Sequence, residues 1–115
     1  MPRIALALLF AAALDAQSRQ ELTERFGQPV TATFEAPTGA LYAAGYLLRL
    51  TVDPFPGAAR LGASAASPAF LVKLDAGRQI VWAAYFGSTQ ADLPGFIRVD
   101  NQGRPLVIGY TNGFD

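Results

Sequence analysis

Carboxylates are the side chains of this 115-residue chain that could perform acid–base chemistry or hold a metal ion. In its second half they are Asp75, Asp92, Asp100 and Asp115. A carboxylate pair can hydrolyse a glycosidic bond, and alternating oxygen ligands can bind calcium. Asp75 and Asp100, however, each begin a tight-turn sequence that favours a side-chain acceptor. We therefore interpret both as turn residues, and Asp100–Gly103 lacks the ligand alternation of a calcium loop.

Side chains that could act as nucleophiles are few. Lys73 is the only lysine, and a strand lysine could form a Schiff base or transfer a proton. Because Val72 and Leu74 flank it, its side chain should leave their face, which favours a solvated lysine that blunts strand-edge pairing. Serine needs an activating base, and the chain has no histidine and no Gly-x-Ser-x-Gly elbow. Ser64, Ser67 and Ser88 therefore have no histidine to activate them as nucleophiles.

The composition excludes further classes of site. With no histidine and no cysteine, the chain has no imidazole base, thiol nucleophile, zinc finger or disulfide. Nine basic residues balance nine acidic ones, so there is no electrostatic footprint for nucleic acid. The sequence thus predicts a protein that is not an enzyme. We expect no catalytic, cofactor-binding or metal-binding residues, no cofactor and no nucleic-acid partner.

The N-terminal residues 1–16 have the layout of a secretory signal peptide. Arg3 precedes an uninterrupted apolar run, Ile4–Leu14, and small Ala16 stands at a plausible cleavage position. Cleavage before Leu14 is an alternative to cleavage after Ala16. A buried helix or a short membrane anchor is an alternative to the signal peptide as a whole. The run is shorter than the about 20 residues that span a bilayer. We expect a secreted, periplasmic or cell-surface protein without stable membrane insertion.

The elements that position these residues begin with a helical lead-in over residues 17–28. Ser18 and Glu21 form a capping-box pattern, and Leu22 and Phe26 share one helical face. Glycine and proline then end the helix, which we expect to pack across a sheet edge.

Short strands follow, and the fold class predicted is all-β. Six runs rich in β-branched and aromatic residues are bounded by turn residues. They are Val30–Phe34, Leu41–Tyr46, Ala69–Leu74, Gln79–Phe86, Phe96–Val99 and Leu106–Tyr110. The last four predict consecutive antiparallel strands joined by hairpins over Ala69–Tyr110. The small-residue stretch Pro54–Pro68 predicts an irregular connection, with residues 57–67 as a linker loop.

Aromatic residues offer two interpretations. In Gln79–Phe86, alternation places Ile80, Trp82 and Ala84 on one face, and both faces are apolar, as in a strand covered on both sides. The core interpretation is favoured over a sugar-stacking surface. The residues that such a surface would use are Trp82, Tyr85, Phe86, Tyr46 and Tyr110.

The sequence contains an internal repeat. Gly39–Tyr46 aligns with Gly103–Tyr110 at a constant offset of 64 residues, with both glycines and the tyrosine matched. Gly45 and Gly109 fall inside predicted strands, which suggests close backbone approach to a neighbouring unit.

These segments resemble a known family. Ala69–Asp75 (AFLVKLD), Ile80–Gly87, Ile97–Gly103 and Leu106–Thr111 are similar, in order, to the four strands of the bacterial seven-bladed beta-propeller repeat, the SBBP repeat. Ser88 departs from the family's usual second glycine. The resemblance implies a four-stranded antiparallel propeller-type blade over residues 68–115, preceded by a partial, degenerate repeat over residues 29–56.

The resemblance also implies a function. It suggests a non-enzymatic structural or interaction module of an exported bacterial β-propeller repeat protein, a fragment of a larger propeller. Its partner would be an extracellular protein or glycan. One alternative is a self-assembling, lectin-like glycan binder that forms a homo-oligomer through blade faces. A fragment of a propeller hydrolase or lyase is a further alternative.

Overall fold

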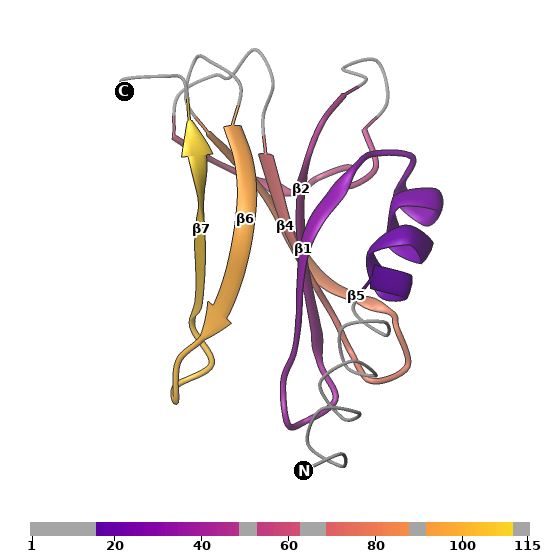
Figure 1. Cartoon of the computed structure of the whole chain (residues 1–115), viewed down its shortest axis with the longest axis vertical. Coiled ribbons are helices and arrows are strands. Elements are labelled where there is room, and N and C mark those ends of the chain that lie inside the picture. Colours follow the sequence, from indigo (N-terminus) through magenta and orange to yellow (C-terminus); the bar gives the residue numbers. More distant parts are fainter. Residues whose placement is uncertain (1–15, 49–52, 63–68, 88–91, 112–115) are drawn as a thin grey trace, which may run out of the picture.

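The computed structural model describes residues 16–48, 53–62, 69–87 and 92–111 (Figure 1). Within these ranges it contains one helix, over residues 16–26, and seven strands. The strands are β1 Val30–Glu35, β2 Leu41–Tyr46, β3 Ala59–Gly62, β4 Ala69–Leu74, β5 Ile80–Gly87, β6 Asp92–Val99 and β7 Pro105–Thr111. The mostly-β fold with a short N-terminal helix is thereby confirmed. The predicted signal peptide, apart from residue 16, lies outside the described residues.

The strands form two separate sheets. The larger sheet has the order β1-β2-β4-β5-β3, with β1, β2, β4 and β5 antiparallel and β3 parallel to β5, while β6 and β7 pair only with each other in the described chain. The prediction of four consecutive hairpin-linked strands over Ala69–Tyr110 was wrong, because β5 is not paired with β6. Only the β4–β5 and β6–β7 connections carry the Asp-initiated turn that forces adjacent pairing. The four consecutive antiparallel strands of a sheet are therefore β1, β2, β4 and β5, rather than the β4, β5, β6 and β7 that the resemblance implied, and neither sheet is closed into a ring.

The expected linker over residues 57–67 contains a strand. Ala59–Gly62 forms β3, which pairs in parallel with Ala84–Gly87 along the outer edge of β5. A strand edge left open presents unpaired backbone donors and acceptors, and β3 satisfies this part of the β5 edge. The loop interpretation was therefore wrong at residues 59–62.

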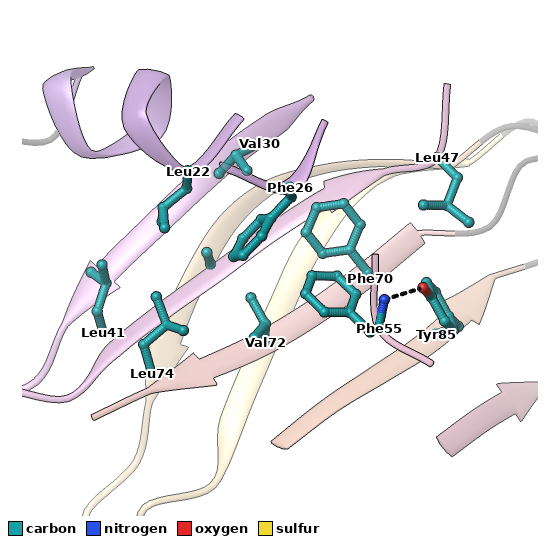
Figure 2. Close-up of a cluster of buried hydrophobic side chains, with 11 residues drawn as sticks. Leu22, Phe26, Val30, Leu41, Leu47, Phe55, Phe70, Val72, Leu74 and Tyr85 are labelled. Atoms are coloured by element: carbon teal, nitrogen blue, oxygen red, sulfur yellow. Dashed lines mark hydrogen bonds between the residues drawn. The ribbon is translucent and has the colours of Figure 1, made fainter. Parts of the chain in front are cut away.

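The N-terminal helix packs on a face of the larger sheet. The prediction that it packs across a sheet edge was wrong. Leu22 and Phe26 are buried against side chains from β1, β2, β4 and β5 (Figure 2). Gly27 ends the helix as predicted, with a φ of 70° and a hydrogen bond of 2.9 Å from its N–H to the Thr23 carbonyl. Ser18 lies inside the helix and is not its N-cap.

The opposite face of the larger sheet is covered by the β6–β7 hairpin, so the molecule has three layers (Figure 1). A second core forms there around Ile97, with Val99 and Val107 packed against it. From the larger sheet this core takes Ala32, Tyr42, Ala44 and Leu71. Because strand side chains alternate, consecutive residues of β2 contribute to different cores, one on each face.

A register shift changes the faces of β5. Leu74 pairs with Ile80 but Lys73 pairs with Trp82, so one extra residue of β5 bulges out between them. Ladder partners share a face, which places Ile80 with Leu74 on the helix side and Trp82 with Lys73 on the hairpin side. The prediction that Ile80 and Trp82 share a face was therefore wrong.

The offset of 64 residues seen in the sequence recurs in the strand registers. In the first hairpin Val30 pairs with Gly45, and in the second Pro94 pairs with Gly109. In each hairpin a register shift follows this pair, and four further pairs then stand at corresponding positions. The hairpins β1–β2 and β6–β7 are thus two copies of one local structure.

The turns of these two hairpins correspond as well. The Ala36 N–H donates to the Ala40 carbonyl at 2.8 Å, and the Asp100 N–H donates to the Arg104 carbonyl at 3.0 Å. The glycine in each turn, Gly39 with φ 90° or Gly103 with φ 78°, adopts the left-handed conformation that glycine tolerates best. The aligned glycines of the sequence repeat therefore have one structural cause.

Candidate functional site

The two aspartates predicted to be turn residues hold turns. Asp75 Oδ1 accepts from the Gln79 N–H at 2.9 Å, and Asp100 Oδ1 accepts from the Gln102 N–H at 2.9 Å and the Arg104 N–H at 2.8 Å. The Arg104 backbone and side-chain donors hold the pKa of the Asp100 carboxyl below its usual value. Both turn assignments are confirmed, and the two carboxylates lie in turns of different sheets.

Five of the other candidate side chains lie outside the described residues. The Asp92 backbone belongs to β6, but its side chain lies outside the described residues, as do Asp115 and the three serines considered above. Across ranges 16–48, 53–62, 69–87 and 92–111, no three acidic side chains gather closely enough to hold a metal ion.

Lys73 does not blunt a sheet edge, contrary to the prediction. It lies in β4, between β2 and β5, and is half-buried. Its Nζ lies 5.7 Å from the centroid of the Tyr42 ring. A strand that is paired on both sides has no edge to protect, so the lysine instead places its charge beside an aromatic face.

The aromatic residues divide between core and surface. Tyr85 is 2% exposed, in agreement with the core interpretation, and Phe86 packs against the second core. Trp82 is 37% exposed, and its ring lies 6.3 Å from that of Tyr42 in an edge-to-face arrangement. The Tyr110 side chain lies outside the described residues. A stacking surface could therefore use Trp82 but not Tyr85.

A shallow hollow of about 360 Å³ lies between the segment before β3 and the start of β5. Its lining is mostly apolar and comprises Pro54, Phe55, Pro56, Gly57, Ala58, Ala59, Ile80, Trp82 and Ala83. Sequence reasoning missed this site because it treated the segment as a connection. The Pro-Phe-Pro sequence was the signal that could have indicated an ordered apolar surface.

A hydrogen-bond cluster fixes Phe55, one of the residues that line this hollow. The Phe55 N–H donates to the Tyr85 oxygen at 3.2 Å (Figure 2). It also donates to Asp53 Oδ1 at 3.1 Å, and the Tyr85 hydroxyl donates to the same oxygen. Burial, and then the Asp53 carboxylate, raise the pKa of Tyr85 well above its usual value of 10.0. The phenol therefore stays neutral and acts as a fixed donor that pins the loop to β5.

The outward face of the β6–β7 hairpin is a second candidate surface, here called the outer face. Phe96 and Ile108 are a cross-strand pair, and Leu106 lies two residues from Ile108 on the same side. These three large apolar side chains are each more than half exposed. Exposed apolar side chains that share one face indicate an interaction surface.

Comparison with protein-family models gave no match, and comparisons with curated proteins and with solved structures gave none either.

The described helix is not long and apolar enough to cross a membrane.

Proposed function

We propose that this chain is a non-enzymatic structural or interaction module of an exported bacterial β-propeller repeat protein, and one piece of a larger array of repeats. The observation that carries the proposal is the repeated hairpin: β6–β7 copies β1–β2 in register and packs face to face on the sheet that contains it. Propellers and solenoids bury their apolar faces in this way, one unit against the next.

Two further features support the non-enzymatic part of the proposal. The turn aspartates Asp75 and Asp100 use their carboxylates to hold backbone donors, and the Tyr85 hydroxyl is engaged by Asp53 and Phe55. These polar groups are therefore committed to local structure. The apolar outer face and the hollow beside Trp82 are surfaces suited to binding rather than to bond-breaking.

Export is the part of the proposal that a single experiment can test. The full chain would be expressed in a Gram-negative bacterium, and the intact mass of the product in each cell fraction would be measured. We expect a periplasmic product that lacks residues 1–16. Leu8→Arg, which interrupts the apolar run, should leave an uncleaved cytoplasmic chain, whereas Leu48→Arg, at an exposed position, should still be exported. An uncleaved cytoplasmic wild-type chain would contradict the proposal.

Glycan binding is a second candidate, because one observation favours it: Trp82 is 37% exposed and is one of the residues that line an apolar hollow. Sugars stack on such rings, and the chain's single tryptophan makes its fluorescence specific for this position. Glycans selected on an array would be titrated against the exported chain. Binding at this hollow should change the fluorescence of the wild-type chain and of Val81→Ala, an exposed neighbour. Trp82→Ala has no tryptophan signal, so its binding is measured on the array, where it should be lost. A glycan that binds both variants equally would exclude this hollow.

A further inference from the structure

The outer face has a counterpart within the molecule, which carries Phe34 where the outer face carries Arg98 beside Phe96. At the offset of 64 residues, Phe96, Leu106 and Ile108 correspond to Ala32, Tyr42 and Ala44, which occupy the same register positions in β1 and β2. The two sets differ in exposure: 5%, 3% and 0% for the residues of the first hairpin, against 59%, 59% and 51% for those of the second. This face is therefore covered by other residues in the first hairpin and exposed in the second.

The cover on the first copy is known. Ile97, Val99 and Val107, on the inward side of β6–β7, pack on the core that contains Ala32, Tyr42 and Ala44. The Thr31 hydroxyl also donates to the Pro94 carbonyl. This bond joins the register shift of the first hairpin to the register shift of the second. The molecule thus contains an established interface between the front of one strand pair and the back of the next.

The back of the first hairpin is already occupied. At the same offset, Ile97, Val99 and Val107 correspond to Thr33, Glu35 and Ala43. Ala43 is fully buried in the core that includes Leu22 and Phe26 of the N-terminal helix. The helix therefore lies where a preceding strand pair would lie, and it acts as a cap. Among the described strands, the outer face of β6–β7 is the face that continues the stacking order (Figure 1).

We propose that the outer face of β6–β7 docks a further strand pair of the same repeat, carried in tandem on the same polypeptide and presenting branched aliphatic side chains as Ile97, Val99 and Val107 do. The proposal rests on the proposed function and deepens it: the array grows from one face only, because the helix closes the other. Phe96 and Ile108 are larger than Ala32 and Ala44, and Leu106 is smaller than Tyr42, so the partner face must be shaped to accept them.

The test inserts one repeat period into the full chain. A second copy of residues 48–111 is placed after Thr111, which stands at the position equivalent to Leu47, so the chain continues in phase. The inserted copies of β4 and β5 then pair beside β7, and the inserted β6–β7 covers the original outer face. Hydrogen exchange is measured for the original amides of residues 92–111. We expect it to slow at least about tenfold, because burying even one large apolar side chain shifts an opening equilibrium by that factor.

Two substitutions in the original part of the extended chain control the experiment. Ile108→Asp should abolish the slowing, because it places a charge in the new interface. Val81→Asp, at a similarly exposed apolar position on β5, should retain it. In the chain without the insertion, Ile108→Asp should leave the circular dichroism spectrum unchanged.

Three outcomes would overturn the proposal. They are unchanged exchange at residues 92–111, an extended chain that gains no strand signal, and dimerisation of the unextended chain that Ile108→Asp abolishes. The last would show that an identical face is the true partner. These results are independent of export: a cleaved, exported chain whose extension gives no protection would refute the docking surface alone.

Discussion

At the scale of single residues, Tyr85 links three parts of the structure. Its ring belongs to the core beneath the helix, its hydroxyl reaches Asp53 and the Phe55 N–H, and the Arg60 guanidinium carbon lies 4.9 Å from its ring centroid. A buried donor with these partners stabilises the loop only while it keeps its proton. Its contribution to stability therefore depends on pH.

Tyr85→Phe tests this dependence. The substitution should lower the free energy of unfolding by about 1–3 kcal/mol at neutral pH, because a hydrogen bond to a carboxylate is lost. The folded-state pKa is raised, so the unfolded chain releases its proton first, and the stabilisation is complete below pH 10 and declines above it. Urea unfolding from pH 8 to 11 should show the wild-type advantage over the variant shrinking by at most about 1.4 kcal/mol per pH unit. A constant advantage would contradict the hydrogen bond.

Gly45 is the residue with the least room. A Cβ atom there would lie 1.9 Å from the Pro29 carbonyl oxygen and 2.8 Å from Cζ of Phe70. The sequence predicted that another part of the backbone lies close to this glycine. The close neighbours are Pro29 and Phe70, which belong to the same part of the molecule rather than to a neighbouring repeat unit.

Gly45→Ala should therefore be strongly destabilising, by at least about 1–3 kcal/mol, because a backbone atom must move. Gly77→Ala is the matched control, since its Cβ would meet only the Asp75 carboxylate at 3.3 Å. Thermal melts of both variants check the prediction. A Gly45→Ala melt as high as that of Gly77→Ala would show that the strand can shift to make room.

At the scale of elements, three turns share one design. Ala36–Ala40, Asp75–Gln79 and Asp100–Arg104 have the same pair of backbone hydrogen bonds, and their fourth residues have positive φ. Two of these fourth residues are glycines, but the third is Arg78, with φ 67°. Its guanidinium donates to the Gly39 carbonyl at 3.2 Å and lies 3.7 Å from Glu35, joining two turns.

Comparing two substitutions of Arg78 separates backbone strain from these contacts. Arg78→Ala and Arg78→Gly both lose the guanidinium, but only alanine retains a strained left-handed backbone. Arg78→Ala should be less stable than Arg78→Gly by about 1 kcal/mol. Chemical denaturation of the two variants measures the difference directly. Equal stabilities would mean that the turn relaxes out of the left-handed conformation.

Local chemistry made some elements predictable. The helix end at Gly27 and the turns at Asp75 and Asp100 depend on residues a few positions apart, and their type sets the backbone conformation. The β2–β4 and β3–β5 pairings join segments separated by long connections, for which the sequence holds no comparable signal. The extra residue in β5 was also invisible, since strict alternation assigns Ile80 and Trp82 to one face. The hollow beside Trp82 depends on those non-local pairings, so it could not be predicted.

At the scale of the whole molecule, Ile97 and Phe96 are neighbours that serve different surfaces. Ile97 is 1% exposed in the second core, and Phe96 is on the outer face. Ile97→Asp should detach β6–β7 from the larger sheet and lower the free energy of unfolding by more than about 2 kcal/mol. Phe96→Asp should change it by less than about 0.5 kcal/mol.

Hydrogen exchange distinguishes local detachment from global loss of structure in these variants. In Ile97→Asp, the amides of β6 and β7 should lose protection while those of β4 retain it, because β4 is paired on both sides within the larger sheet. Equal loss in all strands would mean that the two sheets unfold as one unit.

The position of the cap in the chain has a consequence for how the protein is made. The helix precedes in sequence the face that it covers, and β6–β7 follows the face on which it lies. A ribosome releases the polypeptide N-terminus first, so the helix and the first hairpin are available before the segments that stack on them. We therefore expect each layer to pack on the one that precedes it in the chain, so that the order of stacking follows the order of synthesis.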